Sequence, residues 1–367
     1  MNELLEAPEI LDVPDVDTEA KFQTPEARSL FDLARPKPDD RTELLRHRFL
    51  CRGGGLLLCG PTGVGKSSLS LQAMILWAVG KPCFDITPAR PLKSLLIQAE
   101  NDDGDLAEFR DGICAGLNLT PAEIEMARSN VIVVREDART SIRFFSEVVE
   151  PLLESHKPDL LWMDPALAYL GGETGSQRDV GSFLRNSLNP LLHHHDCAAV
   201  IVHNTNKPPK GQEKPDWQAG DFAYLGSGSA EWANWPRAVL VVRSVGSHDV
   251  FELRAPKRGG RLNWKDGDGQ TVYRKFIAHA KEPGVICWRE VDPDEIETGG
   301  RPKSYDPEEL LALLPPEGLA TSEWQKLAKS ELGISEATFH RERRALAKAG
   351  RILKSKVTNK WQPIKSA

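Results

Sequence analysis

The chain has 367 residues, 40% of them hydrophobic and 27% charged, a balance typical of a globular protein with one large domain and a small one. No apolar run approaches the ~18 residues of a membrane-spanning helix, and the N-terminus is acidic where a signal peptide would be basic and then apolar. We therefore expect a cytoplasmic protein without membrane contact. The six cysteines include no Cys-x-x-Cys pair, which indicates neither a zinc site nor a disulfide framework.

The net charge is −6, but the charged residues are unevenly distributed along the chain. Residues 1–40 carry eleven acidic and four basic residues, a net charge of −7 (4 − 11), together with five prolines and no sustained apolar period. This composition predicts an extended or partly disordered arm. Residues 321–367 carry eleven basic and four acidic residues, a net charge of +7 (11 − 4). A solvated surface is the simpler interpretation of either run alone, but the basic end is the candidate for nucleic acid.

Between these ends, in an expected domain at 41–290, short apolar β-rich runs alternate with helical patterns. The expected strands are 56–59, 94–99, 131–134, 160–163 and 198–202, and helices are expected to begin at Lys66, Leu106, Ile142 and Val180. Strands that alternate with helices in this way predict an α/β domain with a parallel sheet covered on both faces. Two further strands are expected at 239–243 and 250–254, with a hairpin-like turn at 246–248.

The first strand is followed by Gly-Pro-Thr-Gly-Val-Gly-Lys-Ser, residues 60–67. Glycines allow backbone N–H groups to curl around phosphates, Lys66 supplies a positive charge, and Ser67 offers a hydroxyl to Mg²⁺ where a helix begins. The pattern predicts a phosphate loop that binds ATP or GTP. The residues expected to contact the nucleotide are Gly60, Pro61, Thr62, Gly63, Val64, Gly65, Lys66, Ser67 and Ser68.

Hydrolysis of a bound triphosphate needs a metal ligand and a base at the carboxyl ends of neighbouring strands. Asp164 ends one apolar run and is expected to hold Mg²⁺ with Ser67. Glu100 ends another run and is the candidate to orient the attacking water, the alternative being a strand-ending acid in a turn. His203 ends a third run and could contact a phosphate or the water, although a lone histidine there is more often structural.

The last sixty residues predict a second domain. Residues 291–306 are polar with Pro and Gly and predict a linker. Residues 307–367 then show three helical patterns and two short extended runs, the order of a winged helix-turn-helix. Its basic residues could meet DNA phosphates, or the module could instead contact protein. The DNA-binding candidates there are Arg341, Arg344, Lys348 and Lys356.

The combined motifs resemble the RecA-like ATPases of the RepA type, hexameric helicases of plasmids, with relatives in phages and mobile elements and with DnaB-type helicases more distant. The resemblance covers roughly residues 45–260 and is carried by 60–67, 94–101, 158–172, 200–207 and 226–243. It implies a RecA-like fold, a homo-oligomeric ring with active sites between subunits, and ATP and Mg²⁺ as ligands. Lys66, Glu100 and His203 would then be the phosphate-binding lysine, catalytic acid and strand-end sensor.

Rings of this kind complete each site with an arginine from the next subunit. Arg237 and Arg258 both follow the sensor strand as the resemblance implies; Arg237 is slightly favoured, and the alternative is that both are surface residues. The long polar loop after Asn204 would line the central channel, where Lys207, Lys210 and Lys214 could follow single-stranded DNA, unless it is only a flexible insertion.

Together these features predict an ATP-dependent DNA motor, a ring-forming helicase that replicates a plasmid, phage or integrated element, with a primase or replication initiator as a further partner. Two alternatives stay open at this point. One is a RecA-like ATPase that remodels recombination or repair complexes without unwinding, and the other is a DNA-binding regulator switched by ATP.

Overall fold

The computed structural model describes residues 27–37, 39–205, 221–226, 228–245, 250–266, 269–292, 307–355 and 358–364. The chain divides into two compact units, residues 1–41 and 42–367. In the first unit the described residues form one 3₁₀ turn, η1 (Leu30–Asp32), where the N–H of Phe31 donates to Ser29 Oγ at 3.2 Å. Most of the expected arm, residues 1–26, lies outside the described residues.

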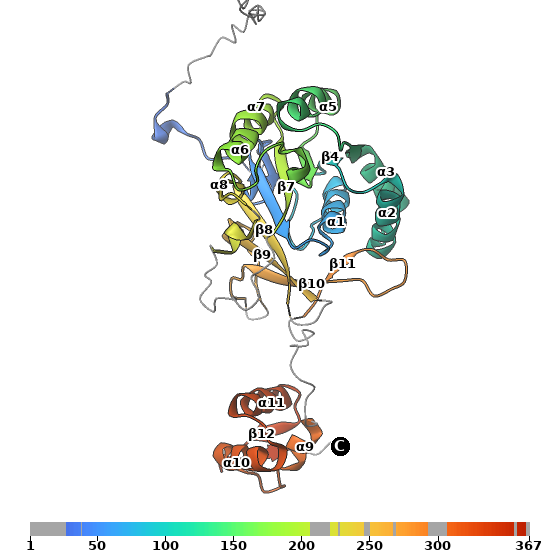
Figure 1. Ribbon diagram of the computed structural model, residues 1–367. Helices are drawn as coiled ribbons and strands as arrows, with labels where there is room; N and C mark the ends of the chain where they lie inside the picture. Colours follow the sequence, from blue (N-terminus) through green and yellow to red (C-terminus); the bar gives the residue numbers. More distant parts are fainter. Residues whose placement is uncertain are drawn as a thin grey trace, which may run out of the picture. The chain divides into compact units, whose positions relative to one another are not determined.

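The large domain is built on a nine-stranded sheet within the described part of the chain (Figure 1). Six strands run parallel: β3 (Gly55–Gly60), β4 (Ser94–Gln98), β5 (Val131–Arg135), β6 (Leu160–Asp164), β7 (Ala198–Asn204) and β8 (Ala238–Ser244). The sheet order is β11-β10-β9-β8-β3-β7-β6-β4-β5. Strand β3, which leads into the phosphate loop, is therefore central, and the expected parallel α/β core is confirmed.

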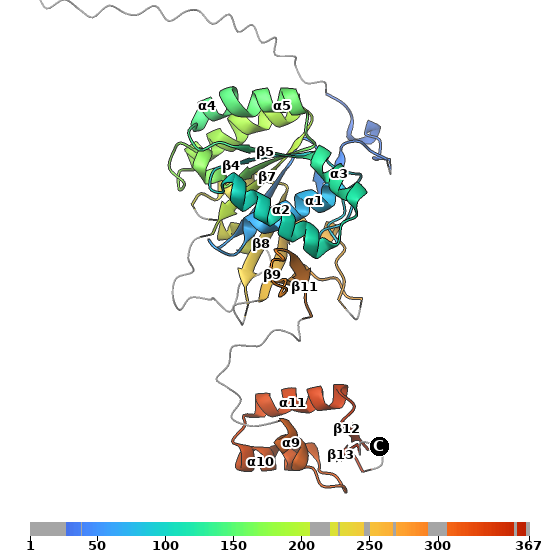
Figure 2. The same cartoon turned by 90° about the vertical axis from the view of Figure 1, so that its right-hand side faces the viewer.

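Helices cover both faces of this sheet (Figures 1 and 2). One face carries α1 (Lys66–Ala78), α2 (Asp103–Leu117) and α3 (Pro121–Asn130); the other carries α4 (Ser141–Phe144), α5 (Glu150–His156), α6 (Gln177–Gly181) and α7 (Asn189–His194). Successive strand residues point to opposite faces. Leu56 and Leu58 accordingly pack with the first group of helices, and Leu57 and Cys59 with the second.

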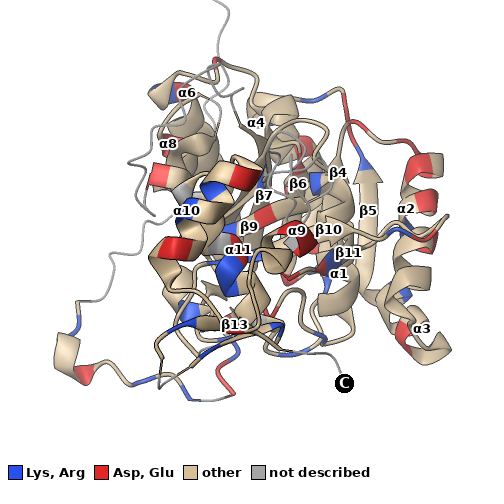
Figure 3. Cartoon of the chain, turned by 90° about the horizontal axis from the view of Figure 1, so that it is seen from below, with Lys and Arg blue, Asp and Glu red and all other residues tan. Residues whose placement is uncertain are grey.

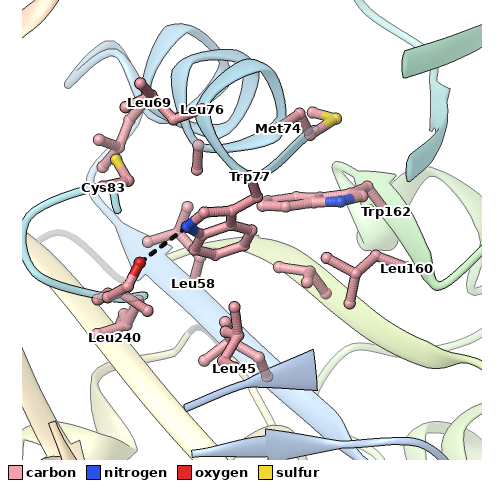
Figure 4. Close-up of a cluster of buried hydrophobic side chains, with 14 of the residues drawn as sticks. Leu45, Leu58, Leu69, Met74, Leu76, Trp77, Cys83, Leu160, Trp162 and Leu240 are labelled. Carbon is pink, nitrogen blue, oxygen red and sulfur yellow. Dashed lines mark hydrogen bonds between the residues drawn. The ribbon is translucent and has the colours of Figure 1, made fainter. Parts of the chain in front are cut away.

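A pair of tryptophans fills the core between α1 and the sheet (Figure 4). Trp77 of α1 and Trp162 of β6 are 2% and 1% exposed, and their ring centroids lie 5.7 Å apart. Trp77 Nε1 donates to the carbonyl of Ile86 at 3.0 Å, so the indole is buried with its polar atom satisfied. These contacts hold α1, which begins at the phosphate-loop lysine, firmly on the sheet.

Two π-helical segments interrupt the helices on the opposite face, and each precedes a proline. Segment η2 (Phe145–Val149) leads into Pro151, and η4 (Ser182–Leu188) leads into Pro190. Proline lacks an N–H and clashes with the carbonyl four residues earlier, and a local π turn accommodates it without ending the helix. The two segments pack together through Phe145 and Phe183, whose ring centroids are 4.8 Å apart.

An antiparallel extension continues the sheet beyond β8. It consists of β9 (Val250–Lys257), β10 (Arg274–His279) and β11 (Trp288–Glu290), of which only the first was expected. A small hairpin of β1 (Glu43–Leu45) and β2 (Leu50–Cys51) precedes β3. Shorter elements are η3 (Ala166–Tyr169), η5 (Asp221–Leu225), α8 (Glu231–Asn234) and η6 (Gly259–Arg261). The expected turn at 246–248 lies outside the described residues.

The C-terminal residues form three helices and a hairpin with a separate core. The elements are α9 (Pro307–Ala312), α10 (Thr321–Leu332), α11 (Glu336–Lys348), β12 (Ile352–Lys354) and β13 (Trp361–Pro363), and the strands pair antiparallel. Trp324, Phe339 and Leu346 are buried in their core. Residues 293–306, most of the expected linker, lie outside the described residues. Among the helices that are described, none is long and apolar enough to cross a membrane.

Candidate nucleotide-binding site

The phosphate loop joins the end of β3 to the start of α1, as the sequence pattern predicts. Gly63 and Gly65 have φ angles of 78° and 88°, in the left-handed region that favours glycine. A Cβ on Gly60 would lie 2.7 Å from the carbonyl oxygen of Val242 in β8, so the loop also starts too close to the next strand for a larger residue. These glycines let the loop curve around the first turn of α1, whose N–H groups lack helical partners and can bind an anion.

Lys66 is held inside its own loop. Its Nζ donates to the carbonyls of Gly60 and Pro61 at 3.1 and 2.8 Å, and to Asn204 Oδ1 at 2.8 Å. The side chain is only 8% exposed. Burial lowers the pKa of Lys66, and the nearby carboxylates of Asp164 and Glu100 counteract that shift. The positive charge therefore lies at the position where β and γ phosphates are expected.

Asp164 ends β6 with its carboxylate 6% exposed, and the hydroxyl of Ser67 donates to it. Burial raises the pKa of Asp164 to about 6, with a further rise from the charge of Glu100. A buried carboxylate beside a hydroxyl suits Mg²⁺, which prefers oxygen ligands and is commonly bound by one or two carboxylates plus waters and phosphate oxygens. The hydroxyl of Ser67 and the carboxylate of Asp164 are both oxygen donors, so the residues present fit that mode of magnesium binding.

Glu100 lies just beyond the end of β4 and is exposed. Strand β4 is the neighbour of β6, with Gln98 paired to Asp164, so both carboxylates emerge at the same edge of the sheet. The electrostatic influence of Glu100 on Asp164 and Lys66 places it in the same group of charges. Helix α2 begins three residues later, at Asp103, with a capping box between Asp102 and Asp105, which leaves Glu100 outside the helix.

The two polar residues at the end of β7 face different environments. His203 is fully buried and stacks on Trp232, with ring centroids 4.4 Å apart. Asn204 pairs with Gly60 of β3 and contacts Lys66. The strand-end residue that contacts the phosphate loop is thus Asn204, which no sequence pattern singled out; the sensor role of His203 stays a prediction.

Arg237 and Arg258 lie at the other edge of the sheet. The backbone N–H of Arg237 donates to the carbonyl of Gly55, where β3 begins, and Arg258 follows the end of the antiparallel β9. Arg258 Nη1 donates to the carbonyl of Arg48 at 2.8 Å, whereas the exposed guanidinium of Arg237 makes no hydrogen bond or ion pair within the described part of the chain. Burial and the charges of Arg261 and Arg237 lower the pKa of Arg258, which marks a shared basic cluster.

The expected DNA-contacting lysines Lys207, Lys210, Lys214 and Lys356 lie outside the described residues. On α11 the backbone carries Arg341, Arg344 and Lys348, and the side chains of Arg341 and Lys348 are likewise not described. Arg344 is exposed, and its Nε donates to the carbonyl of His340 on the same helix. Figure 3 shows the Lys and Arg positions in blue, with acidic residues along the outer helix α2 in red.

A central strand, a glycine loop, a lysine and serine at the start of a helix, and a buried aspartate at the end of a neighbouring strand define a P-loop ATPase with a RecA-like α/β core. The AAA_25 family model, described as an AAA domain, matches residues 18–210, more than half of the chain, and the protein belongs to this family. The match ends before β8 and the C-terminal helices.

A crystal structure of the RadB recombinase aligns with a TM-score of 0.39 at 12% sequence identity, covering 62% of this chain and 88% of that one. No curated protein matches this chain.

Proposed function

We propose that this ATPase is a DNA motor that assembles as a hexameric ring and acts as a replicative helicase of a plasmid, phage or integrated element. The observation that carries the proposal is that the phosphate loop and the basic cluster of Arg237, Arg258 and Arg261 lie at opposite ends of the strands of one sheet. Strand β3 has Gly60 and the loop at one end and Gly55, bonded to Arg237, at the other.

The length of β3 excludes a contribution of Arg237 to the site of its own subunit. Six residues at roughly 3.3 Å each place the Arg237 backbone about 17 Å from the loop, beyond the reach of its side chain. A chain with a triphosphate site at one edge and an available arginine at the other can supply that arginine to the next copy. Repeated head to tail, such a contact generates a ring if the rotation closes.

In this proposal each residue has a distinct task. The loop amides and Lys66 bind the β and γ phosphates, and Ser67 with Asp164 would hold Mg²⁺, which when bound neutralises charge on the phosphate oxygens. Glu100 orients the attacking water and accepts its proton, and Asn204 contacts the terminal phosphate. Arg237 of the adjacent copy stabilises the charge that develops in the transition state. Arg258 has a structural role in this proposal, because its guanidinium is hydrogen-bonded to the Arg48 carbonyl.

Two parts of the chain are proposed to bind DNA. The segment that contains Lys207, Lys210 and Lys214 follows in sequence directly after the strand that ends at Asn204, and in this proposal its lysines contact single-stranded DNA. The C-terminal helices and hairpin have the element order of a winged helix, with α11 as the recognition helix and duplex DNA as its ligand.

The test combines assembly with activity. Native mass measurement with a non-hydrolysable ATP analogue should give a hexamer, single-stranded DNA should stimulate ATP hydrolysis, and a forked oligonucleotide should be unwound, with Lys66→Ala as the inactive control. A protein that hydrolyses ATP and binds DNA but separates no strands would support a remodelling ATPase instead. A protein that stays monomeric with nucleotide and DNA would contradict the ring.

A further inference from the structure

Three arginines surround one buried carboxylate, that of Glu252, in the antiparallel extension of the sheet. They come from three strands that lie side by side, Arg243 from β8, Arg254 from β9 and Arg274 from β10 (Figure 1). Arg254 Nη2 and Arg274 Nη1 donate to Glu252 Oε1 at 2.6 and 3.4 Å, and Arg243 Nε donates to Oε2. Burial alone would raise the pKa of Glu252, but hydrogen bonds from Arg254 and Arg243 outweigh burial and lower that pKa. The carboxylate is therefore charged and fixes this arginine triad in place.

The arginine triad carries more positive charge than Glu252 can balance. Three guanidinium groups against one carboxylate leave a net charge of +2 (3 − 1). In the register of the sheet, Arg274 is the direct partner of Arg254, and Arg243 is the direct partner of Glu252. Like charges directly opposite one another on adjacent strands destabilise a sheet. The fold thus keeps an arrangement that is unfavourable for stability alone, which indicates an anionic ligand.

Most N–H donors of the triad make no hydrogen bond to the described part of the chain. Each guanidinium has five N–H donors in one plane. The hydrogen bonds within the described residues use Nε of Arg243, Nε and Nη2 of Arg254 and Nη1 of Arg274. The Arg243 and Arg274 side chains are 32% and 51% exposed, so their remaining donors can reach a ligand at the surface. Guanidinium groups bind phosphates through two parallel N–H···O bonds.

Two aromatic rings lie among these guanidinium groups. The Cζ atoms of Arg254 and Arg243 are 4.0 and 5.0 Å from the centroid of the Phe222 ring, and Arg274 Cζ is 5.3 Å from that of Phe276. Phe276 is half-buried and lies on the same face of β10 as Arg274, because alternate residues of a strand share a face. Cations with aromatic rings between them are typical of surfaces that bind single-stranded nucleic acid, where phosphates meet the charges and bases stack on the rings.

The position of the triad also favours DNA as the ligand. Phe222 belongs to η5, the first described element after the lysine-containing segment that follows Asn204, so the triad contacts the end of the chain segment proposed above to bind DNA. Arg243 directly follows Val242, whose carbonyl oxygen is 2.7 Å from the position of a Cβ on Gly60. The triad is therefore one residue away from the contact between β8 and the start of the phosphate loop.

We propose that the arginine triad of Arg243, Arg254 and Arg274, positioned by Glu252, is a further binding surface for single-stranded DNA. The inference rests on the proposed DNA motor and adds a surface on the sheet itself to the lysine-containing segment. Arg274, the most exposed of the three, donates to a phosphate, and Phe276 offers a ring on which a base can stack. Phosphates and ring faces are common to all nucleotides, so binding here does not depend on base sequence.

Fluorescence anisotropy of a labelled oligothymidylate with the full-length protein, from low to moderate salt, tests the proposal. Arg274→Ala should weaken binding about tenfold, the loss of one charge-assisted contact, and reduce the slope of log K against log salt by about 0.7, the value for one phosphate of a single strand. Arg274→Lys keeps the charge and should keep the slope. Arg128→Ala, which removes a side chain 74% exposed on α3, is the matched control and should change neither quantity. Melting temperature and ATP affinity show that each variant is folded.

Two results would overturn the inference. Unchanged oligonucleotide affinity and slope in Arg274→Ala would remove the triad from DNA binding, and a lowered melting temperature beside them would assign it to the fold alone. A peptide of residues 1–40, with a net charge of −7 (4 − 11), is the alternative anionic ligand. If Arg274→Ala weakens binding of the peptide but not of the oligonucleotide, the triad binds protein. Failure of the DNA motor itself gives a different result, because the wild type would then bind no oligonucleotide.

Discussion

Lys66 Nζ donates a hydrogen bond to Asn204 Oδ1 at 2.8 Å, and this contact joins the phosphate loop to the end of β7. Lys66 is bonded at the same time to two carbonyls of its own loop, so its charge is held by neutral oxygen atoms. A phosphate that enters the loop offers a stronger, charged acceptor. Lys66 would turn to it, and the Asn204 amide would be released to face the same phosphate.

Asn204→Ala should therefore impair turnover more than binding. We expect the rate of ATP hydrolysis at saturation to fall about 100-fold, the usual effect of removing one transition-state donor, with little change in ATP affinity measured by titration. His203→Ala is the comparison, because that ring is buried against Trp232 and its loss should lower the melting temperature. Lost turnover at unchanged stability in the His203 variant alone would assign the sensor role to His203 and not to Asn204.

Glu100→Gln should retain ATP binding and lose hydrolysis. The amide keeps the size of the side chain but cannot accept the proton of the attacking water, so we expect the hydrolysis rate to fall by roughly 100-fold or more, as for other general bases. Glu108→Gln, on the exposed side of α2, is the matched control. Single-turnover hydrolysis with a saturating excess of enzyme measures the step directly, and an unaltered rate would remove Glu100 from this role.

The sequence could predict those strands and helices that have a local residue pattern, but not those whose position depends on contacts between residues far apart in the chain. Strands β3, β6 and β7 are buried on both faces and read as continuous apolar runs, so they were predictable. Strand β11 has three residues, and its place is decided by two hydrogen bonds between Gln72 and Trp288 and by the close approach of the preceding loop to Gly112 and Gly116 of α2. No local sequence pattern contains these contacts. Helix α3 was not among the expected helices, although the Thr120–Glu123 capping box with Pro121 is a readable signal for its start.

His203 and Asn204, at the end of β7, show that the same limit applies to the nucleotide-binding site. Neighbouring residues of a strand point to opposite faces, so one of His203 and Asn204 had to be turned away from the loop. The choice depends on the register with β3, in which Asn204 pairs with Gly60. Register is a property of the folded sheet, and for that reason the sequence could place both residues at the edge but could not assign their contacts.

Asp164 should make the metal-free protein less stable as pH rises. Its pKa is raised from 3.8 to about 6 in the fold, so proton binding favours the folded state below the unfolded pKa, and this stabilisation is lost as pH rises through 6. Between about pH 4.5 and 7.5 we expect the wild type to lose roughly 2 kcal/mol of unfolding free energy relative to Asp164→Asn. Urea unfolding of both proteins in chelating buffer measures this difference, and parallel pH profiles would contradict the assigned shift.

Mixed oligomers distinguish the two arginines. If Arg237 acts on the site of the adjacent copy, mixing Arg237→Ala subunits with Lys66→Ala subunits, each inactive alone, should restore part of the ATPase activity, because the first keeps its phosphate loop and the second supplies the arginine. Arg258→Ala should lower thermal stability, because Arg258 anchors the backbone at Arg48. ATPase activity of each arginine variant mixed with Lys66→Ala at constant total protein measures this complementation. Restored activity with Arg258→Ala and none with Arg237→Ala would assign the role in trans to Arg258.

In the C-terminal domain, adjacent arginines of α11 should have separable effects. Arg343 lies over the ring of Trp361, with its Cζ 5.1 Å from the centroid, and so connects the helix to β13. Arg343→Ala should therefore lower the melting temperature of the domain. Arg344 is exposed, and a phosphate contact there predicts that Arg344→Ala weakens duplex binding at all sequences and reduces the salt slope of log K by about one.

The salt dependence decides between the two kinds of ligand for this domain. Duplex affinity of wild type, Arg343→Ala and Arg344→Ala is measured by fluorescence anisotropy from low to moderate salt, with melting curves beside it. A protein-binding module would show weak duplex affinity with the same slope in wild type and Arg344→Ala. A DNA-binding module loses one phosphate contact in Arg344→Ala at unchanged melting temperature, because the only described hydrogen bond of that side chain is to its own helix.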